Sequence, residues 1–206
     1  SCSCILGNGM VIDPIGILEE INTLKELNIN VRNRIFIDYY AHIVTPIHKC
    51  IDRVNEAKTN NEIGTTCKGI GPTYTDKYKR IGIRAIDILS SDTLIEKANM
   101  RLKIALNNNE ITEDEVPHLQ EELQLFYSTC MQISEYVQDT FEYLHNALNK
   151  NILIEGAQGT MLDIDYGTYP YVTSSNTVAG AASAGTGLGP RDFNHVLGII
   201  KAYTTR

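Results

Sequence analysis

Several features are missing from this 206-residue sequence, and each absence excludes a class of protein. It contains no apolar run near the length of about 18 residues that a membrane helix needs, and no charged-then-apolar leader, so neither a membrane span nor a signal peptide is expected. Positive charge is in deficit, with a formal net charge of -7 and an isoelectric point near 5.2. A general nucleic-acid binder needs a basic face for phosphate contacts, so that class is not expected either.

The cysteines and histidines lack the spacings of metal sites and of common catalytic sites. The number of cysteines is odd, and none of them forms a CxxC pair: Cys2, Cys4, Cys50, Cys67 and Cys130. Reduced thiols in a cytoplasmic protein are therefore the expectation. The sequence also lacks HExxH, a Gly-x-Ser-x-Gly elbow and the GxxxxGK(S/T) phosphate loop.

The hydrophobic pattern predicts a mixed α/β fold with a mostly parallel sheet. Helices are expected over 14–27, with Asp13 as N-cap, and over 92–106. A stripe at three- and four-residue steps predicts one long amphipathic helix over 118–149, after a TEDE capping box at 112–115. Short strands are expected at the opening run, at 35–37, at 152–154 and at 196–203. The helices around 90–150 would form an insert in the α/β fold.

Two glycine-rich stretches are candidate ligand loops. GTTCKGIGPTYTDKYKRIGIR, residues 64–84, combines four glycines with five Lys/Arg, so its backbone could cradle a phosphate that its side chains neutralise. The alternative is a surface turn followed by a solvated basic helix. EGAQGTMLDIDYGTYPYVTSSNT, residues 155–177, offers an amide at Gln158 and neutral donors from Thr173 to Asn176. Asp163 and Asp165 could be acid/base groups, metal ligands or loop solvation, and a plain turn-rich connection remains open.

A third stretch, GTGLGP at 185–190, superficially resembles a dinucleotide loop. Its spacing is GxGxG, no predicted strand leads directly into it, and Pro190 follows, so the pattern favours that interpretation only weakly.

Taken together, these stretches resemble the adenylosuccinate synthetase family. The first is similar to the family signature GTT-x-x-GIGP-x-Y-x-DK-x-x-R-x-G-(I/L)-R, and the second is nearly the other family hallmark. ILGNGMVIDP near the start and GTGLGP with VLGIIKAYTTR at the end also match, in the family's order. The resemblance covers the whole chain, and it implies a P-loop-like, GTPase-related α/β fold.

The resemblance also implies an activity. The family uses GTP and Mg²⁺ to join IMP and L-aspartate, through 6-phosphoryl-IMP, in purine biosynthesis. Its members are cytoplasmic homodimers. By resemblance Thr66 binds the IMP phosphate, Gln158 and Thr173 make further IMP contacts, and Arg80 reaches the phosphate bound by the neighbouring subunit. Neither a nucleic-acid polymer nor a membrane is expected as a partner.

The match also implies parts that these residues do not carry. The family's phosphate loop, catalytic Asp and His, and the Mg²⁺ and GTP sites are expected outside this segment, and the chain is expected to be truncated at both ends and inactive alone. The pair Cys67-Lys68 replaces the family's Gly-Arg, which removes an arginine fork and a flexible glycine. Two alternatives stay open: a non-catalytic IMP-binding or dimerisation module, and a phosphate-binding α/β enzyme of another family.

Overall fold

The computed structural model describes residues 2–58 and 66–202, and it is a mixed α/β protein. The strands are β1 (Cys4–Leu6), β2 (Val11–Ile12), β3 (Ile35–Asp38), β4 (His42–Ile43) and β5 (Val137–Gln138). The helices are α1 (Pro14–Glu26), α2 (Pro46–Lys58), α3 (Ile70–Lys79), α4 (Ser91–Asn107), α5 (Val116–Ile133), α6 (Thr140–Asn146) and α7 (Ala181–Thr186). Short 3₁₀ turns cover Ala85–Leu89, Glu113–Glu115, Ser134–Tyr136, Thr160–Leu162 and Pro190–Asp192.

All the paired strands among the described residues run parallel. One sheet has the order β1-β3-β5, with Cys4 opposite Ile35 and Ile37 opposite Val137. A second pair joins β2 to β4, with Val11 opposite His42. Parallel strands need crossover connections, and α1 lies in the one between β1 and β3. The predicted α/β class with a mostly parallel sheet is therefore confirmed.

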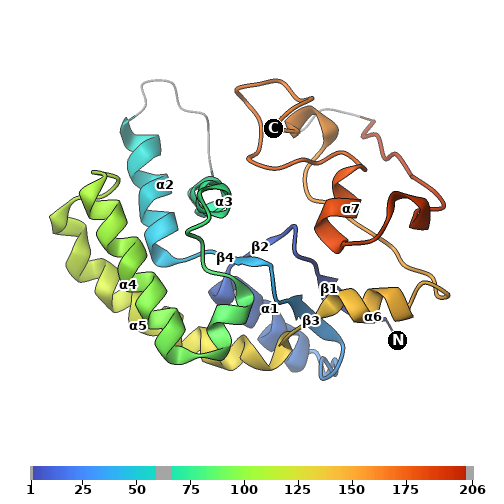
Figure 1. Cartoon of the computed structure of the whole chain (residues 1–206), viewed down its shortest axis with the longest axis horizontal. Coiled ribbons are helices and arrows are strands. Elements are labelled where there is room, and N and C mark those ends of the chain that lie inside the picture. The colour runs from blue at the N-terminus through green and yellow to red at the C-terminus, as the bar shows by residue number, and fades with distance from the viewer. Residues whose placement is uncertain (1, 59–65, 203–206) are drawn as a thin grey trace.

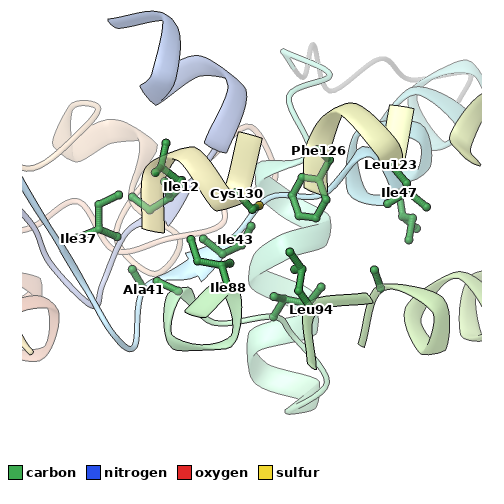
Figure 2. Close-up of a cluster of buried hydrophobic side chains, with 14 of the residues drawn as sticks. Ile12, Ile37, Ala41, Ile43, Ile47, Ile88, Leu94, Leu123, Phe126 and Cys130 are labelled. Carbon is green, nitrogen blue, oxygen red and sulfur yellow. The ribbon is translucent and has the colours of Figure 1, made fainter. Parts of the chain in front are cut away.

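The core lies between these strands and the helices α4 and α5 (Figures 1 and 2). Figure 2 shows Phe126 and Cys130 on α5 facing Ile43 of β4 and Ile88 of the 3₁₀ turn. Every residue of this apolar cluster lies between positions 12 and 137. Residues 151–202 form a separate group of loops around α7, on the other side of α3 from α4 and α5 (Figure 1).

Local signals placed several elements correctly. Asp13 caps α1 by accepting a hydrogen bond from the Ile15 N–H at 3.3 Å, and Pro14 occupies the first turn. The predicted helix over 92–106 is α4, which Ser90 caps through the Thr93 N–H. The capping box is also present, since the Thr112 N–H donates to Glu115 at 2.8 Å.

The prediction of one helix over 118–149 is wrong. α5 ends at Ile133, and after a 3₁₀ turn the chain extends as β5, which pairs with β3. Asp139 then caps α6 by accepting from the Phe141 N–H at 2.9 Å. The apolar stripe continues through this break because Val137 is buried as a strand residue and Leu144 as a helix residue. The spacing of apolar residues alone does not reveal a change from helix to strand when the buried positions keep the same spacing across it.

The predicted strands at 152–154 and 196–203 are also wrong for the residues that the structure describes. Residues 152–154 and 196–202 pair with no described strand, and their apolar side chains face solvent: Leu153 is 90% exposed and Ile200 is 94% exposed. A strand is stabilised by its ladder partners, so an apolar run without one remains irregular. Pro46 begins α2, where a proline costs no backbone hydrogen bond.

Candidate functional site

The first glycine-rich stretch forms a turn that leads into α3. Gly64 and Thr65 lie outside the described residues, and Thr66 is exposed. Gly69 precedes the helix with φ of 76°, and a Cβ on it would lie 2.9 Å from the Lys49 N atom of α2. Only glycine fits this left-handed position against another backbone. The turn after Thr66 is therefore pressed onto α2.

A carboxylate from α2 fixes this turn. The buried Asp52 side chain accepts a hydrogen bond from the Gly69 N–H at 2.8 Å. Gly69 has no side chain to cap α3, so Asp52 of α2 supplies a carboxylate at the start of α3. The dipole of α3 favours negative charge at that end. Cys67, with φ of 52°, occupies the left-handed region, which favours glycine.

α3 is anchored to α2 and α4 by a buried ionic cluster. Asp76 accepts hydrogen bonds from His48 Nε2 at 2.9 Å and from Arg101 Nε, and all three side chains are at most 4% exposed. Arg101 also donates from Nη1 to Glu110 at 2.7 Å. Burial opposes ionisation of Asp76, but His48 and Arg101 outweigh it and lower the pKa of the carboxyl group. The carboxylate is therefore the anchor of α3.

His48 takes part in this cluster as a neutral ring. Burial lowers its pKa more strongly than Asp76 raises it. The Thr45 N–H lies 3.0 Å from His48 Nδ1, which assigns the acceptor role to Nδ1 and the proton to Nε2, facing Asp76. Arg101 thus supplies the positive charge, and His48 supplies an oriented hydrogen bond.

Arg80 lies at the opposite end of α3 from Thr66. It is the C-cap of the helix, with φ of 64°, and its side chain is exposed. A 10-residue helix is about 15 Å long, so Arg80 and Thr66 do not converge on one phosphate within this chain.

The other basic residues of the stretch also diverge. Lys77 reaches the Asn8 carbonyl at 3.4 Å, Lys79 lies 3.8 Å from Glu110, and the Arg84 guanidinium stacks 5.4 Å from the Tyr40 ring centroid. These three residues contact different parts of the chain, and neutralisation of one phosphate by the five Lys/Arg together stays a prediction.

The second glycine-rich stretch folds around Asp163. This fully buried carboxylate accepts backbone hydrogen bonds from Asp165 and Tyr166 on one oxygen, and from Thr177 and Val178 on the other, at 2.6 to 3.2 Å. Burial alone would raise its pKa, but the four N–H donors lower the pKa to about 2. Asp163 therefore organises the loop, and its oxygens are already occupied by these backbone donors.

The predicted residues of the second stretch occupy different surroundings. Thr173 is half-buried, and its N–H donates to the Leu162 carbonyl at 2.8 Å, which fixes its backbone in the loop. Gln158 is exposed with φ of 62°, directly before Gly159, whose carbonyl accepts from Leu162 and Thr177. The two stretches meet at α3, where a Cβ on Gly71 would lie 3.2 Å from Ser174 Oγ. The structure therefore places the loop of Thr173 beside the start of α3, while Arg80 lies at the other end of that helix.

The GTGLGP stretch is a helix end, because α7 finishes inside it and Gly187 terminates the helix with φ of 75°. A dinucleotide loop precedes its helix, so that interpretation fails.

Sequence reasoning missed the residues that hold these loops: Asp52, Asp76, His48, Arg101 and Tyr74. The sequence carries no clear signal for the two aspartates, because the residues three and four positions away from Asp52 and Asp76 are mostly polar. Among the described residues, no group of three His, Cys, Asp or Glu side chains is arranged to hold a metal ion. None of the described helices has both the length and the apolar character to cross a membrane.

The parallel strands and their covering helices define the class, a mixed α/β protein, and comparison with known proteins gives its family. The family model described as adenylosuccinate synthetase matches residues 1–206, so the chain belongs to that family. It is 46% identical to the adenylosuccinate synthetase of Chlorobium limicola over all of this chain, and 46% identical to that of Endomicrobium trichonymphae over 98% of it. Each match covers 48% of the relative, so the chain spans about half the length of the curated relatives it matches.

Solved structures agree with this assignment. The fully ligated adenylosuccinate synthetase of Plasmodium falciparum superposes with a TM-score of 0.87 at 38% identity, over 98% of this chain and 47% of that one. A succinoaminodeoxyadenylate synthetase of cyanophage S-2L, at 22% identity and a TM-score of 0.54 over 93% of this chain and 42% of that one, shares the fold.

Proposed function

We propose that the protein containing this chain is an adenylosuccinate synthetase, a cytoplasmic ligase of purine biosynthesis that joins IMP to L-aspartate at the expense of GTP. The observation that carries the proposal is the family match over all 206 residues. The meeting of the two family stretches at Gly71 and Ser174 supports it, because a site built from both needs them side by side.

Within this proposal, the residues described here bind and orient IMP. Thr66 would bind the phosphate with its hydroxyl, and Thr173 would contribute a second hydroxyl from the neighbouring loop. Hydroxyl groups suit this role because they donate hydrogen bonds to phosphate oxygens. Gln158 can both donate and accept, and it would contact IMP after its exposed turn moves toward the loop.

The proposed ligase also needs GTP and Mg²⁺, which supply the phosphoryl group and neutralise its charge during transfer to IMP. We place both sites outside the described residues. GTP would give its terminal phosphoryl group to IMP and leave as GDP, and the amino group of aspartate would then displace phosphate from the purine ring. This chain's residues would bind and orient the nucleotide during both steps.

A homodimer would complete the phosphate site, with Arg80 contributed by the other subunit. The support is geometric: α3 separates Arg80 from Thr66 by about 15 Å, and the Arg80 side chain is exposed. An exposed arginine that lies far from the phosphate loop of its own subunit could reach the phosphate site of the other subunit. Its planar guanidinium group can bind a phosphate there with two hydrogen bonds.

Activity of the protein encoded by the complete reading frame tests the ligase. GTP hydrolysis should require IMP and L-aspartate together, and it should produce adenylosuccinate. GTP turnover that is independent of IMP would refute the proposal. A non-catalytic IMP-binding or dimerisation module is the alternative, and binding of IMP without any turnover under these conditions would favour it.

Mixing two inactive variants tests the shared site. Thr66→Ala and Arg80→Leu proteins should each be impaired, but a mixed dimer of the two has one intact site. Equal mixing should therefore restore about a quarter of the wild-type rate, since half of the dimers are mixed. No recovery after subunit exchange would place Arg80 in its own subunit's site or outside the site.

A further inference from the structure

One side chain of α3 belongs to neither the proposed phosphate contacts nor the ionic cluster. Tyr74 is half-buried, and its hydroxyl donates a hydrogen bond to the Gly9 carbonyl at 2.8 Å. Burial raises the pKa of the phenol, so the hydroxyl remains protonated and able to donate at neutral pH. Tyr74 therefore ties α3 to a loop that lies 65 positions earlier in the chain.

That opening loop, residues 7–10, is tied in turn to the last part of the chain. The Gly9 N–H donates to the Gly185 carbonyl at 3.2 Å. A Cβ on Gly9 would lie 2.7 Å from Gly185 Cα, so the two backbones touch where a side chain would not fit. Lys77 adds a second link from α3, with its ammonium group 3.4 Å from the Asn8 carbonyl.

The loop that carries Thr173 reaches the same face of α3. Gly71 lies three residues before Tyr74, one turn away on that face, and Ser174 packs against it. Burial raises the pKa of the Tyr74 phenol, and the nearby Ser175 side chain of the same loop opposes that rise. The Tyr74 hydroxyl thus stands where three segments meet: the opening loop, α3 and the loop organised by Asp163.

We propose that Tyr74 is a positioning residue that aligns the Thr173 loop with α3 and the Thr66 turn. This inference rests on the proposed function, because its consequence is IMP affinity. The proposed role requires no contact between Tyr74 and the nucleotide. It holds the opening loop and the second family stretch against one helix, so that hydroxyls from both stretches face the same ligand. Small displacements of such groups weaken binding strongly, because the hydrogen bonds depend on geometry.

The test is Tyr74→Phe in the protein encoded by the complete reading frame, a change that removes a single oxygen atom. Tyr78→Phe is the matched control, since Tyr78 lies on the same helix but is 74% exposed. Loss of one hydrogen bond at the junction should raise KM for IMP by about 3- to 10-fold, while KM for GTP stays within about 2-fold. Tyr78→Phe should leave both values unchanged.

A purely structural role would have a different signature. It would lower the amount of folded enzyme, and hence the maximal rate, without changing KM for IMP. That result, or an equal rise in the KM values of all substrates, would overturn the proposal. Turnover of GTP by the wild-type protein without IMP would instead refute the proposed function. This measurement is made on the wild-type protein first, so the two failures are distinguished.

Amide hydrogen exchange provides a readout that does not depend on activity. Tyr74→Phe should speed exchange in residues 7–10 and 172–176, relative to wild type and to Tyr78→Phe, because both segments lose their shared contact. Unchanged exchange in both segments would show that Tyr74 does not align them, and would overturn the proposal whatever the substrate.

Discussion

The chain up to residue 150 and the chain from 151 to 202 are held in place by different forces. The first region contains the whole apolar cluster, and its helices pack on parallel strands. In the second, Leu188 is the single buried apolar side chain among the described residues. Its order comes instead from hydrogen bonds to Asp163, and from backbone contact between glycines 9 and 185.

The difference shows where a ligand loop can be built. Loops in the first region are set by rigid helices, as Gly69 is set by Asp52 of α2. Loops in the second region are set by one carboxylate and by contact with α3. An apolar core tolerates substitutions that conserve side-chain volume. A loop that is held by hydrogen bonds to one carboxylate loses several of them at once when that residue is replaced. The two regions should therefore respond differently to substitution.

Breaking the buried ionic cluster should have the largest effect on the first region. Arg101→Leu leaves Asp76 buried without its cationic partner, and should lower the free energy of unfolding by about 3–5 kcal/mol. Urea denaturation measures the loss. Lys97→Met on the same helix is the control, because the partly exposed Lys97–Asp87 pair should contribute at most about 1 kcal/mol. Similar losses in the two variants would contradict a special role for the buried cluster.

Removing the central acceptor should unfold the second region locally. Asp163→Asn turns an NH₂ group toward backbone N–H donors, so at least two hydrogen bonds are lost. Hydrogen exchange over residues 163–178 should accelerate strongly, while the urea midpoint of the first region stays near wild type. Asp165→Asn is the control, since Asp165 is exposed and its carboxylate accepts only from Asn176 among the hydrogen bonds described. A loop that keeps its protection in Asp163→Asn would refute this account.

Acid should weaken the first region through its buried histidines. Burial, with the charges of Lys77 and Arg84, lowers the pKa of His42 to about 4, and burial also lowers the pKa of His48. The unfolded chain binds protons on both rings below about pH 6.5, while the folded chain keeps them neutral, so stability falls as the pH falls below that value.

For His42 alone, the loss between pH 6.5 and 4 is about 3 kcal/mol. His42→Gln should flatten the measured pH dependence of unfolding, and the exposed His118→Gln should leave it unchanged. A dependence that is equally steep in His42→Gln would rule out His42 as its source.

The smallest expected effect is at Cys67, where the chain leaves the family pattern. A non-glycine residue at φ of 52° is strained, so Cys67→Gly should stabilise the protein by about 0.5–1 kcal/mol after the entropic cost of glycine in the unfolded chain. Gly69→Ala should do the opposite, since its Cβ would press on α2. Thermal unfolding measures both, and a destabilised Cys67→Gly would show that the Cys67 side chain makes a contact worth more than the strain.

The elements that the sequence predicted correctly are those with strong local signals. α1 and α4 begin at capped residues and carry clear periodicity, and β3 is a short apolar run ending at an aspartate. The long helix failed because β5 is decided by pairing with β3, about 100 residues away. The strands predicted at 152–154 and 196–203 were wrong because an apolar run becomes a strand only when it pairs with the edge of another strand.

The candidate site divides in the same way. The glycine-rich stretches and the residues Thr66, Arg80, Gln158 and Thr173 could be chosen from the order of residues, and their assignment to IMP stays a prediction. The residues that hold these stretches in place could not be chosen from the sequence. Asp52, Asp76 and Tyr74 look like ordinary helix residues, and their contacts appear only when α2, α4 and the opening loop pack around α3.

By itself, the sequence determined the family, the parallel α/β class and the two stretches that carry the proposed site, because these depend on local order along the chain. The tertiary structure decided which charges are buried, that Arg80 and Thr66 lie at opposite ends of one helix, and that Tyr74 meets both the opening loop and the second stretch. The physical reason is that burial and long-range hydrogen bonds depend on which surfaces face one another, and only the folded chain sets that.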